Sequence, residues 1–318
     1  MYLSVVSNPW HIAVDRVISE NCQNTTKYCT SPIFNQRKPE HNTLLLNTIR
    51  KAVLALRMFN ATALFTCMLW AIHPTILHIQ KKHLELEIWL PFKVNSNPQF
   101  YISVVYKWII TSWVAFCNTT IDIFISFSFE QCKTQVSILR ADMATLVQES
   151  KMEALKDSSN FNNILNRRFC KIIIHHKEIV NTVNKIQDTF SGALFYQFLV
   201  SSWILCTSVY RIVNVNPASV EFVSMITYTL CILTELLLFC FYGNEITLES
   251  IKLTDAAYSM DWLEMPVPLR RSLIIFMERI KQPIEPMAGS LVPLSNSTYV
   301  SILRSSYSFY AFLKSSRR

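Results

Sequence analysis

MAGSLVPLSNSTYVSILRSSYSFYAFLK, residues 287–314, is the stretch from which the architecture of this chain can be read. As a helix it is long enough to cross a bilayer, because about 20 residues at a rise of roughly 1.5 Å span the hydrocarbon core. It also carries many hydroxyl groups, which are unfavourable on a helix that faces only lipid. Two interpretations are open: the segment lines a path of water, or it is a final helix that packs through small residues against its neighbours.

The hydroxyl groups near the end of this segment recur at helical spacing. Ser301, Ser305, Ser308 and Phe312 follow an i, i+4, i+7, i+11 pattern and are predicted to share one face. This face would be polar with an aromatic group near its outer end. Arg304 lies on the same segment, and we expect it to face a neighbouring subunit or the membrane interface.

The whole chain has the composition of a polytopic membrane protein. Its 318 residues are 51% hydrophobic and 16% charged, with a mean hydropathy of +0.24, whereas soluble domains are typically about 25% charged. The formal net charge of +8 is concentrated between long apolar runs, and no nucleic-acid-binding motif accompanies it. We therefore expect basic loops beside membrane lipid and no nucleic-acid partner.

Four earlier apolar runs are predicted to cross the membrane, which makes five crossings with the final segment. They lie at residues 44–77, 101–129, 190–210 and 222–242. Lys and Arg are most frequent between the second and third runs and again between the fourth run and the final segment. This bias predicts a cytosolic N-terminus, and an odd number of crossings then predicts an extracellular C-terminus.

The basic segments also carry helical periodicity. Apolar residues recur at three- and four-residue steps over residues 161–186 and again in SLIIFMERI, residues 272–280. These stripes need partners, so they predict a bundle of cytosolic helices, called the cytosolic anchor region below. The predicted fold class is all-α: a polytopic transmembrane helical bundle with an inside N-terminus and this anchor. The expected parts are an irregular N-terminal segment (1–43), membrane helices with an outer loop and cytosolic amphipathic helices (44–286), and a pore-lining final helix with the C-terminus (287–318).

Two acidic residues lie inside predicted crossings. A carboxylate at mid-membrane depth costs on the order of 3 kcal/mol, so Asp122 and Glu235 should face protein or water. Asp122 could instead lie near the inner end of its crossing and pair locally. The two acids could attract cations or pair with donors on nearby helices, and the sequence leaves both possibilities open.

The sequence offers little for catalysis or for a cofactor. With three glycines and no phosphate-binding motif, loops that cradle phosphate are not expected. His175 and His176 point to different faces of a helix, so a packed or solvated role is favoured over metal binding. We expect no enzyme activity, no catalytic residues, no cofactor and no metal, and a membrane enzyme that uses Asp122 and Glu235 is the remaining catalytic alternative.

A set of C-terminal motifs is specific when taken together. They are Ala257-Tyr258, Trp262, Arg279-Ile280-Lys281-Gln282-Pro283, Ala288-Gly289, Pro293-Leu294-Ser295 and Ser306-Tyr307-Ser308-Phe309-Tyr310. Upstream, the stretch from Gln131-Cys132 to Leu139, the pair His175-His176 and the run from Ser201 to Cys206 belong to the same set. The set resembles the signature of insect odorant receptors, and the resemblance covers about residues 44–316.

The resemblance implies an odorant-gated, non-selective cation channel that works as a heterotetramer with a common co-receptor in the plasma membrane of sensory neurons. It implies seven membrane helices, of which the last lines the pore and the cytosolic ends of the fourth to seventh join the subunits. The five crossings match the third to seventh helices, so the first two are expected to be missing and replaced by residues 1–43. A gustatory-type chemoreceptor, or a truncated non-conducting membrane subunit, is the alternative.

A small volatile hydrophobic ligand is then expected in the outer half of the bundle. Candidate walls are Phe65, Met68, Leu69 and Ile72 on the first crossing, Tyr106, Ile110 and Trp113 on the second, and Met225 and Tyr228 on the fourth. Each of these residues could equally be plain packing. In the final helix, Ser301, Ser305 and Ser308 are the candidate pore residues, and Phe312 and Ser316 fall where the family's narrow outer gate would lie.

Overall fold

The computed structural model of this chain describes residues 39–80, 97–157, 160–217 and 219–315. The expectations for residues 1–38, for the outer loop at 81–96 and for Ser316 therefore lie outside the described residues. The side chain of Phe312 also lies outside the description, although its backbone is part of the final helix.

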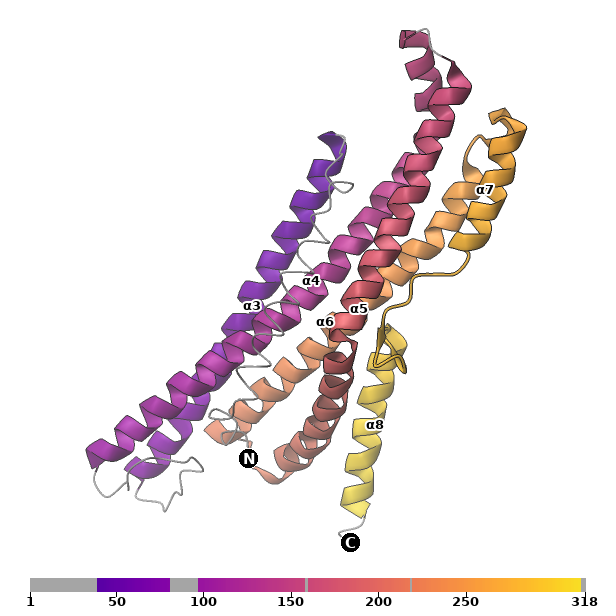
Figure 1. Cartoon of the computed structure of the whole chain (residues 1–318). Helices are drawn as coiled ribbons and strands as arrows, with labels where there is room; N and C mark the ends of the chain where they lie inside the picture. Colours follow the sequence, from indigo (N-terminus) through magenta and orange to yellow (C-terminus); the bar gives the residue numbers. More distant parts are fainter. Residues whose placement is uncertain (1–38, 81–96, 158–159, 218, 316–318) are drawn as a thin grey trace.

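Long helices dominate the described part of the chain, so the all-α fold class is confirmed. The elements are α3 (Pro39–Ile79), α4 (Asn97–Asp157), α5 (Phe161–Asn214), α6 (Val220–Ser259), the short 3₁₀ helix η1 (Trp262–Glu264), α7 (Val267–Ile280), strands β1 (Met287–Ala288) and β2 (Val292–Pro293), and α8 (Asn296–Ser315). Helix α3 packs against α4 and α6, and α8 packs against α5 and α6 on the other side of the bundle (Figure 1).

Four described helices, α3 to α6, are long and apolar enough to cross a membrane, and they contain the four apolar runs predicted from the sequence. Only 17–22% of their most apolar windows is buried inside the protein. Large side chains such as Trp113 and Trp203 are 69% and 67% exposed. Apolar surface of this extent fits a lipid environment. Helix α8, with 20 residues, has the length to cross, and its crossing stays a prediction.

Polar side chains cap the helices where the chain reverses. The side chain of Asn160 accepts a hydrogen bond from the backbone N–H of Asn162 at 3.0 Å and caps α5. The hydroxyl oxygen of Ser219 accepts one from the backbone N–H of Phe222 at 3.1 Å and caps α6. Such caps satisfy backbone donors that the first helical turn leaves free. The connection between α5 and α6 is short, so these helices are antiparallel neighbours.

The long amphipathic helix expected over residues 161–186 is confirmed as the first half of α5. Leu165, Phe169, Ile172, Ile179 and Val183 are buried at three-, four- and seven-residue steps. They form a continuous core with buried residues of α4, α6 and α7. The predicted stripe in α7 is confirmed as well, since its buried residues are spaced by one helical turn: Leu269, Leu273, Phe276 and Ile280.

His176 packs in this core, in agreement with the packed role expected for it. It is 7% exposed, and its ring meets the edge of Phe276 with centroids 5.5 Å apart. Burial, together with the smaller effects of the nearby charges of Arg279 and His175, lowers the pKa of His176 to about 4. The ring therefore stays neutral at physiological pH.

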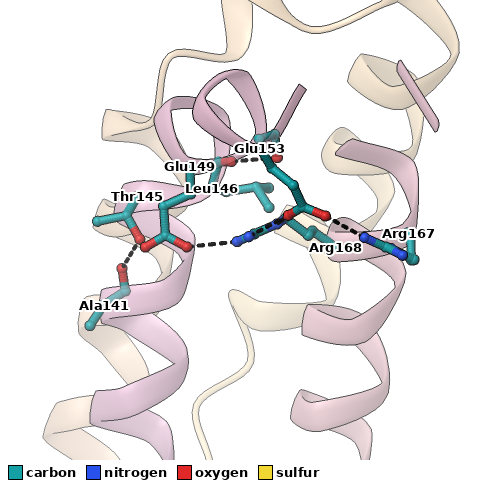
Figure 2. A network of polar contacts seen from close by, with 8 residues as sticks. Ala141, Thr145, Leu146, Glu149, Glu153, Arg167 and Arg168 are labelled. Atoms are coloured by element: carbon teal, nitrogen blue, oxygen red, sulfur yellow. Dashed lines mark hydrogen bonds and ion pairs between the residues drawn. The ribbon is translucent and has the colours of Figure 1, made fainter. Parts of the chain in front are cut away.

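Ion pairs join the C-terminal end of α4 to the N-terminal end of α5. Arg168 of α5 reaches Glu149 and Glu153 of α4 with N–O distances of 2.6 Å to each, and Arg167 reaches Glu153 at 2.5 Å (Figure 2). The hydrogen bond from Arg168 holds the pKa of Glu153 below its usual range. Pairs of this kind, partly open to solvent, orient the two helices more than they stabilise them.

The final segment differs from the expectation of one continuous helix over residues 287–314. Residues 287–293 form a short antiparallel hairpin in which Met287 pairs with Pro293, and the helix begins at Asn296. Gly289 and Ser290 turn the chain with φ values of +61° and +57°. A left-handed pair of residues cannot continue a right-handed helix, and Pro293 lacks a backbone donor. The first described helix, α3, begins at Pro39, five residues before the expected start of the first crossing at residue 44.

Candidate functional site

A cavity of about 350 Å³ lies between α3, α4, α5 and α6, inside the four apolar crossings. Each helix contributes residues one or two turns apart, so one face of every helix points inward. The lining includes Phe59, Ala63 and Trp70 of α3, Ile110, Asn118 and Asp122 of α4, Gln197, Ser201 and Ile204 of α5, and Tyr228, Ile232 and Glu235 of α6. The volume lies at the lower end of the range for small-molecule sites, about 300–1,000 Å³.

The wall of the cavity is largely apolar and contains an aromatic pair. The rings of Trp70 and Tyr228, from α3 and α6, lie with centroids 5.2 Å apart and planes tilted by 52°. Phe59, Ile110 and Ile204 extend the apolar lining. A surface of this kind binds small ligands mainly through burial of apolar area, about 25 cal/mol per Å².

One part of the lining is acidic. Asp122 and Glu235 are 8% and 6% exposed, and both line the cavity. They come from α4 and α6, two helices that pack against each other, and so contribute two carboxyl groups to one cavity. The Oε1 atom of Glu235 is buried and has no hydrogen-bond partner among the described residues. The expectation that each acid faces protein or water is thus met, and none of the ion pairs within the described residues gives Asp122 a local partner.

A hydrogen bond between polar side chains joins α3 and α4 beside the cavity. The hydroxyl of Thr119 donates a hydrogen bond to Oδ1 of Asn60, and Thr119 also lines the cavity. Contacts between hydroxyl and amide groups of this kind join helices inside a membrane, where water is not available to either partner.

Two of the nine candidate ligand residues, Ile110 and Tyr228, line the cavity. The other seven, which are Phe65, Met68, Leu69, Ile72, Tyr106, Trp113 and Met225, lie outside its lining. Several of them are well exposed on the outer surface, Phe65 at 52%, Met68 at 53% and Tyr106 at 45%.

An apolar run predicts a helix but does not fix the rotation of that helix about its axis. The acidic residue Asp122 does indicate which face of α4 points inward. Counting back from Asp122 by four residues gives Asn118, Val114 and Ile110, which all line the cavity.

The candidate pore residues of α8 lie on a face that the bundle leaves open. Ser301, Ser305 and Ser308 are exposed, whereas Ser306 is 5% exposed and faces α5 and α6. Tyr299 and Ile302 pack against the main core from this inner side. Arg304 is exposed. The three serines therefore share a solvent- or partner-facing surface of this helix.

The hairpin before α8 connects this helix to the helices that wall the cavity. The backbone N–H of Gly289 donates to the carbonyl oxygen of Ser191 in α5 at 2.9 Å, and that of Met287 donates to Oε1 of Gln187 at 3.2 Å. Leu294 packs directly against Gly243 of α6. These contacts join α5 and α6 directly to the start of α8.

The described residues contain no group of three or more His, Cys, Asp or Glu side chains that could hold a metal ion. The two cavity acids are therefore not part of a larger ligand set within the described ranges. The two carboxyl groups can accept hydrogen bonds from a donor group that enters the cavity, or form an ion pair with a cationic group.

Comparison with known proteins gives consistent matches along the chain. A family model described as "7tm Odorant receptor" matches residues 10–307. Odorant receptor 94a of Drosophila melanogaster is 26% identical over 243 residues, and Odorant receptor 10 of Aedes albopictus is 26% identical over 168 residues. These alignments cover 75% and 52% of this chain, and 59% and 44% of the respective relatives. The chain thus spans only about half the length of these relatives.

The fold matches a solved structure over almost its whole length. The olfactory receptor OR5 of Machilis hrabei, solved in complex with eugenol, superimposes with a TM-score of 0.75 at 15% identity. The superposition covers 98% of this chain and 83% of that receptor. A second structure of the same receptor gives a TM-score of 0.77.

Proposed function

Because this chain belongs to the 7tm odorant receptor family, we propose that it is a receptor subunit in which a small volatile ligand opens a cation channel. The ligand would bind in the cavity between α3, α4, α5 and α6, and the ions would pass beside α8. The members of this family are receptors. The proposed activity is therefore binding of the ligand and gating of the channel, without catalysis.

The observation that carries this proposal is that α5 and α6 wall the cavity and also hold the start of α8. Ser201 and Glu235 line the cavity, while Ser191 and Gly243 contact the hairpin before α8. A ligand that prefers one arrangement of α5 and α6 would shift the population of α8 positions. Its effect on opening is limited to the difference between its affinities for the two states.

The pore would form where α8 helices of several subunits meet. Ser301, Ser305 and Ser308 would line it, and Phe312 and Ser316 would form a narrow outer gate that closes by excluding water. The exposure of the three serines in a single chain supports this arrangement, because a partner or water must cover them. We propose a heterotetramer with a co-receptor subunit as the assembled form.

The proposed setting is the plasma membrane of sensory neurons, with a cytosolic N-terminus and an extracellular C-terminus. Helix α3 begins at the end of the bundle where α4 joins α5 and where α7 lies, and α8 ends at the opposite end (Figure 1). The basic loops cluster at the former end, which supports its assignment to the cytosol.

Voltage clamp of cells that express this chain with a co-receptor tests the receptor proposal. An odorant panel should evoke cation current in cells that contain both subunits and none in cells with either subunit alone. Ligand-independent current from this chain alone, or no response from the pair to any volatile, would contradict the proposal.

Two neighbouring serines provide a matched test of the pore. A charged thiol reagent should reduce the evoked current of Ser305→Cys, because Ser305 is exposed on the proposed pore face. The same reagent should leave Ser306→Cys at the wild-type level, since Ser306 is 5% exposed and faces the bundle. Equal modification of both variants, or of neither, would remove this face of α8 from the pore. Phe312→Ala should raise the resting leak if Phe312 forms the gate.

A further inference from the structure

The acidic part of the cavity limits the kind of ligand that the proposed receptor can bind. Asp122 and Glu235 come from α4 and α6, and both are more than nine-tenths buried. Glu235 lines the cavity with its Oε1 atom unpaired among the described residues. A buried acceptor without a partner is unfavourable, so its natural complement is a donor that arrives with the ligand.

The described part of the chain supplies no cation to these acids. None of its ion pairs includes Asp122 or Glu235. Other acids in long helices are matched: Glu249 pairs with Arg140, and Glu245 with Lys133. Two neighbouring carboxyl groups inside an apolar bundle are stabilised by an external positive charge, because attraction between charges is strong where water is excluded.

An aromatic surface faces the same cavity. Trp70 and Tyr228 both line it and lie next to each other with centroids 5.2 Å apart. The faces of such rings attract ammonium groups and also cover the apolar body of a ligand. Carboxyl groups on one side and aromatic faces on another are the two chemistries by which proteins recognise a small organic cation.

We propose that the cavity binds a small primary amine in its protonated form. This inference rests on the proposed receptor function and names its ligand class. The ammonium group donates hydrogen bonds to Glu235 and Asp122, and the hydrocarbon part lies against Trp70 and Tyr228. The volume of about 350 Å³ restricts the ligand to a compact molecule such as an arylalkyl amine.

Three isosteric probes test the proposal without any requirement for channel opening. Equilibrium binding to the purified full chain in lipid nanodiscs is measured for phenethylamine, phenethyl alcohol and propylbenzene at neutral pH. The amine should bind at least about tenfold more tightly than either neutral probe, as expected for hydrogen bonds to a charged group. Equal binding of the alcohol would reduce the site to a neutral hydrogen-bond acceptor and overturn the proposal, as would equal binding of propylbenzene or no binding of the amine.

Variants of the acid provide the second measurement. Glu235→Gln keeps the size of the side chain and removes its charge, so the tenfold preference for the amine should disappear. Glu278→Gln is the matched control, because Glu278 is an exposed residue of α7 that pairs with Lys281 outside the cavity. Retention of the preference in Glu235→Gln would overturn the proposal, and Asp122→Asn repeats the test if Glu235→Gln does not fold.

The outcome separates this inference from the receptor proposal. If neutral volatiles evoke current from the chain with its co-receptor while phenethylamine does not bind, the receptor function stands and the amine proposal is wrong. If phenethylamine binds with the expected preference and no volatile evokes current, the amine site stands and the channel function is wrong.

Discussion

Replacement of Gly243 by alanine should loosen the junction between α6 and the start of α8. A Cβ atom at this position would meet the carbonyl oxygen of Leu294 at 2.6 Å and its carbonyl carbon at 3.3 Å, and would overlap its Cβ atom. Ordinary van der Waals contact begins at 3.4 Å, whereas the added Cβ would lie 2.6 Å from the carbonyl oxygen. The carbonyl group therefore has to move away by the difference, about 0.8 Å. Leu294 is 2% exposed, and its backbone N–H is held by Pro286, so the shift cannot be absorbed by a flexible side chain.

The expected magnitude follows from two opposing effects. Alanine favours the helical state over glycine by about 1 kcal/mol in a helix interior. Overpacking in a tight interface costs about 1–3 kcal/mol, and the upper end applies because backbone atoms must move. Gly243→Ala should therefore lower the free energy of unfolding by about 2 kcal/mol.

Gly192 provides the matched control within the same protein. It lies in the interior of α5, and a Cβ atom added there meets no other atom within 4 Å. Gly192→Ala should raise the free energy of unfolding by about 1 kcal/mol. The two variants make the same chemical change, so their difference of about 3 kcal/mol isolates the contact with Leu294.

Unfolding of the purified chain in nanodiscs, followed by heat or denaturant, measures both variants. Evoked current measures the consequence for gating, which should change in Gly243→Ala and stay at the wild-type level in Gly192→Ala. Equal changes in stability for the two variants would refute the reasoning, because they would mean that the approach of α6 to the hairpin has no energetic effect.

Three further changes have defined outcomes. Gly289→Ala should destabilise the chain by about 2 kcal/mol or more. The φ of +61° at this position is strained for alanine, and the added Cβ would lie 2.7 Å from the ring of Phe195. An unchanged unfolding curve would contradict this prediction. Burial lowers the pKa of His176 from 6.5 to about 4, so the unfolded chain takes up the proton first as the pH falls, and about 2 kcal/mol of stability should be lost between about pH 7 and pH 5. His176→Leu should lack this loss, and the same acid sensitivity in both proteins would exclude the histidine as its source. Arg168→Met removes the ion pairs to two glutamates of α4 and should cost at most about 1 kcal/mol, less at high salt; a large loss that is insensitive to salt would show another role.

The main architecture could be predicted because it depends on local patterns. The four apolar runs predicted as crossings are contained in α3 to α6. The periodic burial of Phe169 and Ile172 in α5, and of Leu273 and Phe276 in α7, follows the spacing visible in the sequence. Hydrophobic length and helical period are properties of short segments, so neighbours elsewhere in the chain do not change them.

The start of the final helix could not be predicted in the same way. The hydroxyl-rich segment from Met287 has the length of a crossing, but Gly289 and Ser290 reverse the chain and α8 begins at Asn296. The turn is held by contacts with α5 and α6, such as the hydrogen bond from Gly289 to Ser191. Composition alone does not reveal such a contact, because neither the segment around Gly289 nor the segment around Ser191 has a sequence pattern that indicates the other.

The cavity illustrates the same limit. Seven of the nine candidate ligand residues lie outside its lining, although each belongs to the correct helix. A helix can be recognised from its period, but the face it turns inward depends on the helices that pack around it.

The amino-acid sequence by itself determined the membrane class of this protein, its long helices and the amphipathic stripes at one end, because hydrophobic length and period are local. Only the tertiary structure decided that Asp122 and Glu235 share one cavity with Trp70 and Tyr228. The rotation and register of each helix are set by packing against its neighbours, and these bring together side chains that are far apart in the chain.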